Sequence, residues 1–181
     1  GRDMLTYIEG EVPRGIPLTE AQLYTAIQLL RKMHDLATHS DLCNEQETIC
    51  HHDFSPWNII IKNKKVAGII DFDELAPGAR VDDLTYAIWT FLDLGVAAIS
   101  DAEQLKRIQQ LVNCYDLRNR QDFIPALLRQ QNRILSFRQE VVATSTNQQM
   151  RKFSRGAIQR INQSIEWVKR NEQAIVLSLK Q

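Results

Sequence analysis

The sequence has none of the features that would place it with nucleic-acid-binding or membrane proteins. Lys+Arg and Asp+Glu both number 22 among its 181 residues, so the formal net charge is zero. Binding to nucleic acid depends on an excess of basic side chains that neutralise phosphates. No apolar run approaches the roughly 20 residues that a membrane-spanning helix needs. We therefore expect neither a nucleic-acid partner nor a membrane partner.

Cysteine and glycine are also scarce. The odd set Cys43, Cys50 and Cys114 lacks the spacing of a disulfide framework, which favours a reducing compartment and predicts a cytoplasmic protein. A zinc site made of Cys43, Cys50, His51 and His52 would match no common structural spacing. With only seven glycines, the sequence contains no Gly-rich loop of the kind that surrounds phosphate groups.

Hydrophobic periodicity predicts one mainly helical α+β unit. Thr19 and Gln22 match a capping box in front of a helix over residues 20–37, where apolar residues recur at helical spacing. Further helices are predicted to begin near Asp82 or Asp83 and after a second capping box of Ser100 and Glu103, and to cover about 122–143. A last helix runs through Phe153 towards Leu177, with a bend expected at Gly156.

Two isoleucine-rich runs in the middle of the chain predict a β-hairpin. Residues 58–62 and 66–70 are separated by a polar turn centred near Lys64, so paired residues should have numbers that sum to about 128. Asn58 and Asp71 sum to 129 and should be near neighbours at the mouth of the hairpin. The loop before the hairpin carries Asp53, which the same topology brings close to them. Residues 4–8 predict a separate strand.

This arrangement of polar side chains suits phosphoryl transfer. An amide oxygen beside a carboxylate, here Asn58 and Asp71, is a suitable donor set for Mg²⁺, a hard cation that often binds through phosphates. A separate carboxylate such as Asp53 could orient or deprotonate a hydroxyl nucleophile. A metal on the phosphates and a positioned nucleophile are the main parts of a phosphoryl-transfer site.

At these residues the sequence resembles a known family. His51-x-Asp53-x-x-x-x-Asn58, followed by a strand and by Ile70-Asp71-Phe72-Asp73, is similar to the motifs of the aminoglycoside phosphotransferase and choline kinase-like family, which has a protein kinase-like fold. The segment 77–87, the first ten residues and, more loosely, the helical tail are also similar, so the resemblance covers nearly the whole chain. Its portion 51–87 is the most specific.

The resemblance implies a role for each matching residue. Asp53 corresponds to the catalytic base, and His51 to a residue that braces the catalytic loop. Asn58 and Asp71 correspond to the Mg²⁺ ligands. Asp83 corresponds to a residue that supports the same loop from the following helix. The reaction so implied moves the γ-phosphoryl group of ATP to a hydroxyl group of a small polar substrate, with ATP and Mg²⁺ as cofactors.

The resemblance also implies a division of the chain. Residues 1–10 correspond to the last strand of the N-lobe and the hinge, where the backbone of Tyr7 and Ile8 would face the adenine. Residues 11–181 correspond to a helical C-lobe with the catalytic loop and the metal-binding hairpin, residues 51–74. Ile60 and Ile70 would form an apolar floor below the adenine. Because this chain starts almost at the hinge, we expect most of the N-lobe to be absent.

Two other functional classes remain open at this stage. A truncated relative could keep the motif yet act as a catalytically inactive binding or scaffold module. The cluster of His51, His52 and Asp53 could alternatively serve a metal-dependent hydrolase. Phosphoryl transfer that is abolished by Asp53→Asn would count against the first alternative, and metal retention without nucleotide would favour the second.

The remaining expectations concern partners. Asp73, Glu74, Asp82 and Asp83 make the neighbourhood acidic, as solvated charges or as a surface for a cationic substrate. An exposed strand edge at residues 4–8 would invite a homodimer. We expect the aromatic residues Trp57, Tyr86 and Trp89 to pack in the protein rather than stack on a ligand, as aromatic residues on or near helices usually do. We expect the basic residues of 129–133 to form a solvated helix face.

Overall fold

Six α-helices and four short strands make up residues 6–180, the part of the chain that this computed structural model describes. The predicted α+β, mainly helical class is confirmed. The helices are α1 (Glu20–Ala37), α2 (Arg80–Leu92), α3 (Asp101–Tyr115), α4 (Phe123–Thr144), α5 (Gln148–Arg170) and α6 (Glu172–Ser178). The strands are β1 (Thr48–Cys50), β2 (Ile59–Lys62), β3 (Lys65–Ile69) and β4 (Ala76–Gly78), with 3₁₀ turns at Asp41–Cys43 and Pro56–Asn58.

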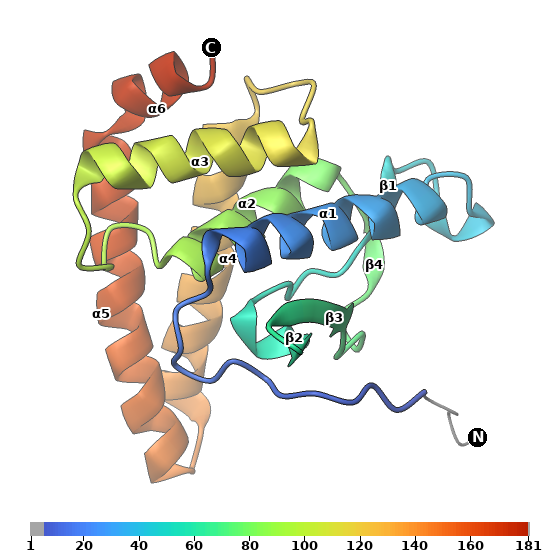
Figure 1. Ribbon diagram of the computed structural model, residues 1–181. Helices are drawn as coiled ribbons and strands as arrows, with labels where there is room; N and C mark the ends of the chain where they lie inside the picture. The colour runs from blue at the N-terminus through green and yellow to red at the C-terminus, as the bar shows by residue number, and fades with distance from the viewer. Residues whose placement is uncertain (1–5, 181) are drawn as a thin grey trace.

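Helix α2 is the central element of the fold. It contacts α1, α3, α4 and β1, and Figure 1 shows it in the middle of the helices. Nine of its thirteen residues are buried, including Asp83 and Tyr86. Buried polar residues on such a helix need hydrogen-bond partners in the interior. Polar side chains of α2 therefore reach the neighbouring loops from within the core.

The hairpin has the register that the sequence predicts. Ile59 pairs with Ile69 and the next pair also sums to 128, before a bulge shifts the last two pairs by one. The turn residues Asn63 and Lys64 both have positive φ, 51° and 63°, as a two-residue type I′ turn requires. Gln22 of the α1 capping box donates to the Lys64 carbonyl, Nε2 to O, at 3.1 Å. Helix α1 thereby holds the tip of the hairpin.

A second pair of strands, β1 and β4, was not predicted from the sequence. Thr48 pairs with Gly78 and Cys50 with Ala76 in antiparallel register. Pro77 and Gly78 lie in this pair; both residue types usually weaken strands, yet short edge strands tolerate them. The pairing joins the two ends of residues 51–75. The catalytic loop and the segment after the hairpin are consequently anchored to each other.

The predicted strand at residues 4–8 is wrong for its described part. Residues 6–8 form no strand and Tyr7 is 85% exposed, while Met4 and Leu5 lie outside the described residues. The segment instead crosses the hairpin and makes a single antiparallel bridge farther along, between Glu11 and Ile61. Strand formation requires a paired neighbour as well as residues with β propensity. Among the described residues, the segment pairs with the hairpin only at Glu11.

Gly10 allows this close approach to the hairpin, and we expect Gly10→Ala to detach the segment. Its φ is 143°, and a Cβ atom there would lie 2.5 Å from Ile60 Cγ2 and 2.5 Å from the Ile61 carbonyl oxygen. Such a clash costs about 1–3 kcal/mol locally. The Glu11 and Ile61 amides, which bond across the bridge, should exchange with deuterium faster. Gly15→Ala is the control, because φ is also positive there but the added Cβ meets no atom within 4 Å; equal effects would contradict the prediction.

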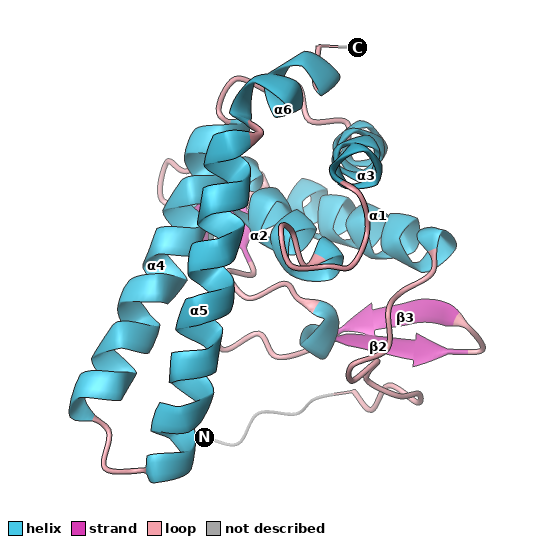
Figure 2. Cartoon of the chain, turned by 90° about the vertical axis from the view of Figure 1, so that its left-hand side faces the viewer, coloured by secondary structure: helices cyan, strands magenta, loops and turns pink. Residues whose placement is uncertain are grey.

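Helix ends agree with the sequence except in two places. Helix α1 covers residues 20–37 with its capping box, as predicted, and α4 keeps Pro125 in its first turn. Helix α2 begins at Arg80, slightly before the predicted start. The last helix continues through Gly156 and is interrupted at Asn171, between α5 and α6. Packing of α5 along α4, visible in Figure 2, outweighs the intrinsic cost of one helical glycine.

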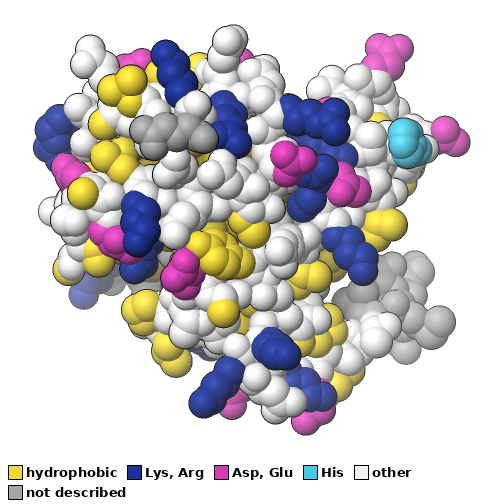
Figure 3. Space-filling model, turned by 45° about the horizontal axis from the view of Figure 1, so that its top comes forward, with side chains coloured by type: hydrophobic (Ala, Val, Ile, Leu, Met, Phe, Trp, Pro, Cys, Tyr) yellow, Lys and Arg dark blue, Asp and Glu magenta, His cyan; other side chains and the backbone are white. Residues whose placement is uncertain are grey.

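None of the helices within residues 6–180 combines the length and the apolar character needed to span a membrane. On the face drawn in Figure 3, basic and acidic side chains lie interspersed rather than gathered by sign.

Candidate active site

Both oxygens of the Asp53 carboxylate accept hydrogen bonds from neighbouring side chains. Asp53 lies in the loop between β1 and β2 and is partly buried. Its Oδ1 accepts from the Tyr86 hydroxyl at 2.6 Å, and its Oδ2 accepts from Asn58 Nδ2 at 2.9 Å. Asn58 Nδ2 also donates to the Asp53 backbone carbonyl at 2.8 Å. Hydrogen bonds to a carboxylate anion are among the stronger ones, so this side chain is well oriented.

Asn58 and Asp71 lie at the mouth of the hairpin. The Ile70 amide donates to the Asn58 carbonyl at 3.0 Å, so Asp71 follows a residue bonded directly to Asn58. Asp71 is exposed and has a φ of 66°, a left-handed conformation that turns the chain out of the strand. Because the Asn58 amide nitrogen bonds to Asp53, its Oδ1 is the atom that can bind a cation. An amide oxygen and a carboxylate are donors that fit Mg²⁺.

His51 connects the catalytic loop to the second strand of the hairpin. Its ring is fully buried. Nδ1 accepts from the Asp53 amide at 3.3 Å, and Nε2 lies 3.0 Å from the Ile70 carbonyl oxygen. A carbonyl can only accept, so the hydrogen belongs on Nε2. Both ring nitrogens are therefore engaged, which leaves neither for a metal and disfavours a metal-dependent hydrolase built on His51, His52 and Asp53.

Asp83 supports the same loop from inside the core. It is 1% exposed, and its oxygens accept from the backbone amides of His51, at 2.5 Å, and His52, at 2.7 Å. Its Oδ2 also lies 3.0 Å from His34 Nε2. Burial raises the pKa of the Asp83 carboxyl, but the His34 imidazole and the two backbone amides outweigh burial and hold it below its usual range. The carboxylate is thus an anion that fixes the loop backbone.

His34, Cys50 and Asp83 form the one group of three metal-ligating types found within residues 6–180. Their potential ligand atoms are already used. His34 Nδ1 lies 2.5 Å from the Tyr115 hydroxyl, and Cys50 Sγ donates to the Ala79 carbonyl at 3.4 Å. Burial raises the pKa of the Cys50 thiol, and metals bind the thiolate. We interpret the group as a buried hydrogen-bond network.

Arg133 of α4 reaches the catalytic loop, which the sequence analysis missed. It was interpreted as part of a solvated helix face, and its side chain is indeed 41% exposed. Its guanidinium nevertheless donates to the His52 carbonyl at 2.7 Å and lies 5.8 Å from the centre of the Tyr86 ring. It also lies 3.9 Å from a carboxylate oxygen of Glu74. The periodicity of α4 could not reveal this, because the contact joins residues 81 apart.

The residues assigned to the adenine site are brought together only in part. The Ile8 side chain lies over Gly68, where a Cβ would be 2.6 Å from Ile8 Cδ1. Ile60 is 8% exposed, next to Gly10, and Ile70 is half-buried. The hairpin thus offers an apolar surface, which Ile8 partly covers. Tyr7 points into solvent.

The acidic residues around the loop differ in their environment. Asp82 lies 2.9 Å from Arg129, and Glu74 faces Arg133. Asp73 is exposed and, within the described residues, makes no hydrogen bond with the other site residues. The negative charge expected near the loop is consequently offset in part by α4.

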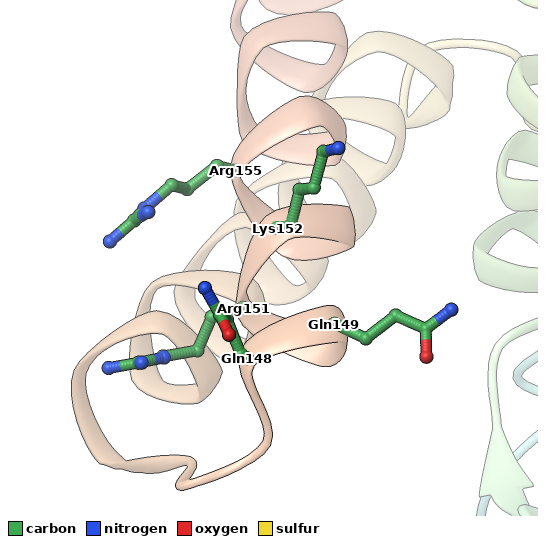
Figure 4. A pocket seen from close by; sticks show the side chains of 5 residues that line it. All are labelled: Gln148, Gln149, Arg151, Lys152 and Arg155. Carbon is green, nitrogen blue, oxygen red and sulfur yellow. The ribbon is translucent and has the colours of Figure 1, made fainter.

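Two hollows lie on the surface of the helices. One, of about 750 Å³, is lined by Asp82 and by an α4 face that includes Arg129 and Arg133, so it lies beside the catalytic loop. The other is an open hollow at the start of α5. Figure 4 shows Arg151 and Arg155 pointing to the same side of that helix. Its lining is Gln148, Gln149, Arg151, Lys152 and Arg155, and it contains none of the Asp53 loop.

Comparisons with known proteins identify a matching family model and two similar proteins. Residues 36–123 match the model of a family described as the phosphotransferase enzyme family. The trifolitoxin immunity protein of Rhizobium leguminosarum bv. trifolii is 31% identical over 104 residues, which cover 49% of this chain and 40% of that protein. A crystal structure from Ralstonia eutropha JMP134, provisionally assigned as an aminoglycoside phosphotransferase, is 16% identical with a TM-score of 0.50.

That structural match covers 86% of this chain and 57% of the other chain, and at this identity it shows the fold alone. The chain thus spans about two fifths of the curated relative and less than two thirds of the solved one. The matched range 36–123 contains the Asp53 loop, the hairpin and α2. The family resemblance inferred from the sequence is confirmed by the match of residues 36–123 to the model of the phosphotransferase enzyme family.

Proposed function

We propose that this chain moves the γ-phosphoryl group of Mg·ATP to a hydroxyl group of a small polar acceptor. One observation carries the proposal. The Asp53 carboxylate is held by Tyr86 and Asn58 at the mouth of the hairpin, and the second strand of that hairpin leads directly to Asp71. A positioned base beside an amide–carboxylate pair is the arrangement that phosphoryl transfer requires.

In the proposed reaction, Asp53 accepts the proton of the acceptor hydroxyl while the acceptor oxygen forms a bond to the γ-phosphorus. The bond between the γ-phosphorus and the bridging β–γ oxygen breaks, and ADP leaves with that electron pair. Asn58 Oδ1 and Asp71 would hold Mg²⁺, which neutralises phosphate charge when bound. His51 and Asp83 hold the loop backbone so that Asp53 keeps its place.

The acceptor is best described as small, polar and hydroxyl-bearing. A cationic acceptor remains a proposal that depends mainly on the exposed carboxylate of Asp73, since arginines of α4 face Glu74 and Asp82. The cytoplasmic location and the division at residue 10 also stay predictions. The homodimer stays a prediction too, but without a strand edge at residues 6–8 to support it.

Calorimetric titration with ATP tests the metal part of the proposal. We expect ATP binding that depends on Mg²⁺, and a loss of at least about tenfold in that affinity in Asp71→Ala, because a charged ligand to the cation is removed. The exposed Asp41, in the 3₁₀ turn after α1, provides the control Asp41→Ala, which should bind as the unsubstituted protein does. Equal affinity in both variants, or no binding by folded protein, would contradict the proposal.

Transfer of labelled phosphate from ATP to a panel of aminoglycosides, amino alcohols and sugar-like alcohols then separates the two remaining functions. Product formation that needs Mg²⁺ supports the phosphotransferase. Mg²⁺-dependent ATP binding without any transfer would instead indicate a nucleotide-binding module that keeps the family site but not its chemistry.

A further inference from the structure

No sequence motif indicates that Tyr86 contacts Asp53. It lies on α2, 33 residues after Asp53, and its side chain is 8% exposed. Its hydroxyl donates to Asp53 Oδ1 at 2.6 Å. Since Asn58 bonds to Oδ2, Tyr86 supplies the second of two side-chain hydrogen bonds to the carboxylate.

Two side chains pack against the Tyr86 ring and restrict the position of its hydroxyl. Trp89 packs edge-on against the ring, with centroids 5.8 Å apart and an interplanar angle of 87°. The Arg133 guanidinium lies over the ring at 5.8 Å, at a distance typical of a cation–π contact. Because Arg133 also bonds to the His52 carbonyl, the same side chain contacts the loop on the residue preceding Asp53.

The Tyr86 hydroxyl keeps its proton near neutral pH. Burial, the nearby Asp53 charge and the hydrogen bond to Asp53 together raise the pKa of Tyr86 far above its usual range, and the more distant charges of Arg133 and Arg138 do not cancel the rise. Tyr86 is therefore the hydrogen-bond donor in this contact, and Asp53 Oδ1 is the acceptor. The contact can hold the base but cannot take its proton.

We propose that Tyr86 is a positioning residue for the base, an inference that rests on the proposed phosphotransferase function. The torsion of an aspartate carboxylate about χ2 is broad, and a single hydrogen bond at Oδ2 leaves it free to turn. The Tyr86 hydroxyl on Oδ1 removes this freedom. One carboxylate orientation is thereby presented to the acceptor hydroxyl, and the entropic cost of aligning the base is met in folding.

Tyr86→Phe tests the inference, because it removes only the hydroxyl and keeps the packed ring. We expect kcat to fall about 10- to 100-fold, with little change in KM for ATP, since the base does not bind the nucleotide. In ¹⁵N-labelled protein, the side-chain amide of Asn58 should change its chemical shift and exchange faster with water, because its partner Oδ2 becomes mobile. This second readout requires no turnover. Unchanged thermal unfolding would show that the variant is folded.

Tyr24→Phe is the matched control. The Tyr24 hydroxyl also donates to a carboxylate, Glu20 Oε1, at 2.6 Å, but on the exposed surface of α1, so neither kcat nor the Asn58 amide should change. An unaltered Asn58 amide in Tyr86→Phe would overturn the inference, as would an altered amide with unchanged kcat. If the unsubstituted protein transfers no phosphate while the Asn58 amide responds to Tyr86→Phe, the proposed function fails and the hydroxyl's hold on Asp53 is supported.

Discussion

Asp53→Asn should lower phosphoryl transfer by about 10²- to 10⁴-fold, the range typical of losing a general acid–base group. Asparagine keeps the size of the side chain and an oxygen for the Tyr86 hydroxyl. Its NH₂ group would face Asn58 Nδ2, but Asn58 keeps its hydrogen bond to the backbone carbonyl of residue 53, so the loop should keep its conformation. It cannot accept the proton of the acceptor hydroxyl. We therefore expect the loss in kcat, measured as ADP release that depends on the acceptor, with Mg·ATP affinity changed by less than about threefold.

The control for this variant is Asp93→Asn. Asp93 follows α2 and lies 2.6 Å from Arg160, both on the surface, so its substitution removes one negative charge without touching the loop. Its transfer rate should equal that of the unsubstituted protein. Retention of more than about a tenth of the rate by Asp53→Asn would show that another group acts as base, and the assignment of Asp53 would be wrong.

Asp83→Asn should lower the free energy of unfolding by about 3–5 kcal/mol, because it removes a buried carboxylate from the donors that compensate its burial. The carboxylate accepts from two backbone amides and faces His34. An asparagine amide has only one acceptor oxygen and would turn its NH₂ group towards one of these donors. Urea unfolding at neutral pH measures the loss, and the catalytic loop should become less protected against hydrogen exchange.

Asp82→Asn is the matched control on the preceding residue. Its partner Arg129 is 56% exposed, and surface ion pairs contribute at most about 1 kcal/mol. Equal destabilisation by both substitutions would contradict the special role of Asp83.

The pH dependence of unfolding gives a second check on Asp83. Its folded pKa is lowered, so the carboxylate contributes its full stability above the unfolded-state pKa, near 4. That contribution is lost as the pH falls below about 4 towards the lowered folded value. The difference in unfolding free energy between the unsubstituted protein and Asp83→Asn should therefore be constant above about pH 5 and shrink in acid. A difference that grows in acid would show that the folded pKa is raised instead.

Elements with strong local patterns were predictable. Helix α1 has the residues 20–37 that its capping box and periodicity indicated. The hairpin register followed from two apolar runs and a short polar turn, which placed Asn58 and Asp71 at the same end. In both cases the determining interactions join residues that are close in the chain. Such interactions depend little on the rest of the fold.

Elements that depend on distant partners were missed or misplaced. The strand predicted at residues 4–8 is not formed in its described part, because the partner strand of the hairpin is met only at Glu11. Strands β1 and β4 form although Pro77 and Gly78 disfavour them, because each supplies the other with an edge. The last helix ends at Asn171 rather than bending at Gly156, since packing along α4 exceeds the cost of one glycine.

The candidate site divides in the same way. By itself the sequence determined which residue types carry the chemistry, the hairpin that brings Asn58 and Asp71 together, and the family resemblance of the 51–87 portion. Tertiary structure alone decided what holds the base in place. Tyr86 on α2 bonds to Asp53, 33 residues earlier in the chain, and Arg133 on α4 bonds to His52, 81 residues earlier. The helical periodicity of the sequence indicates only that Tyr86 is buried and Arg133 is exposed. Hydrogen bonds between residues so far apart in the chain form only once the core around α2 has packed.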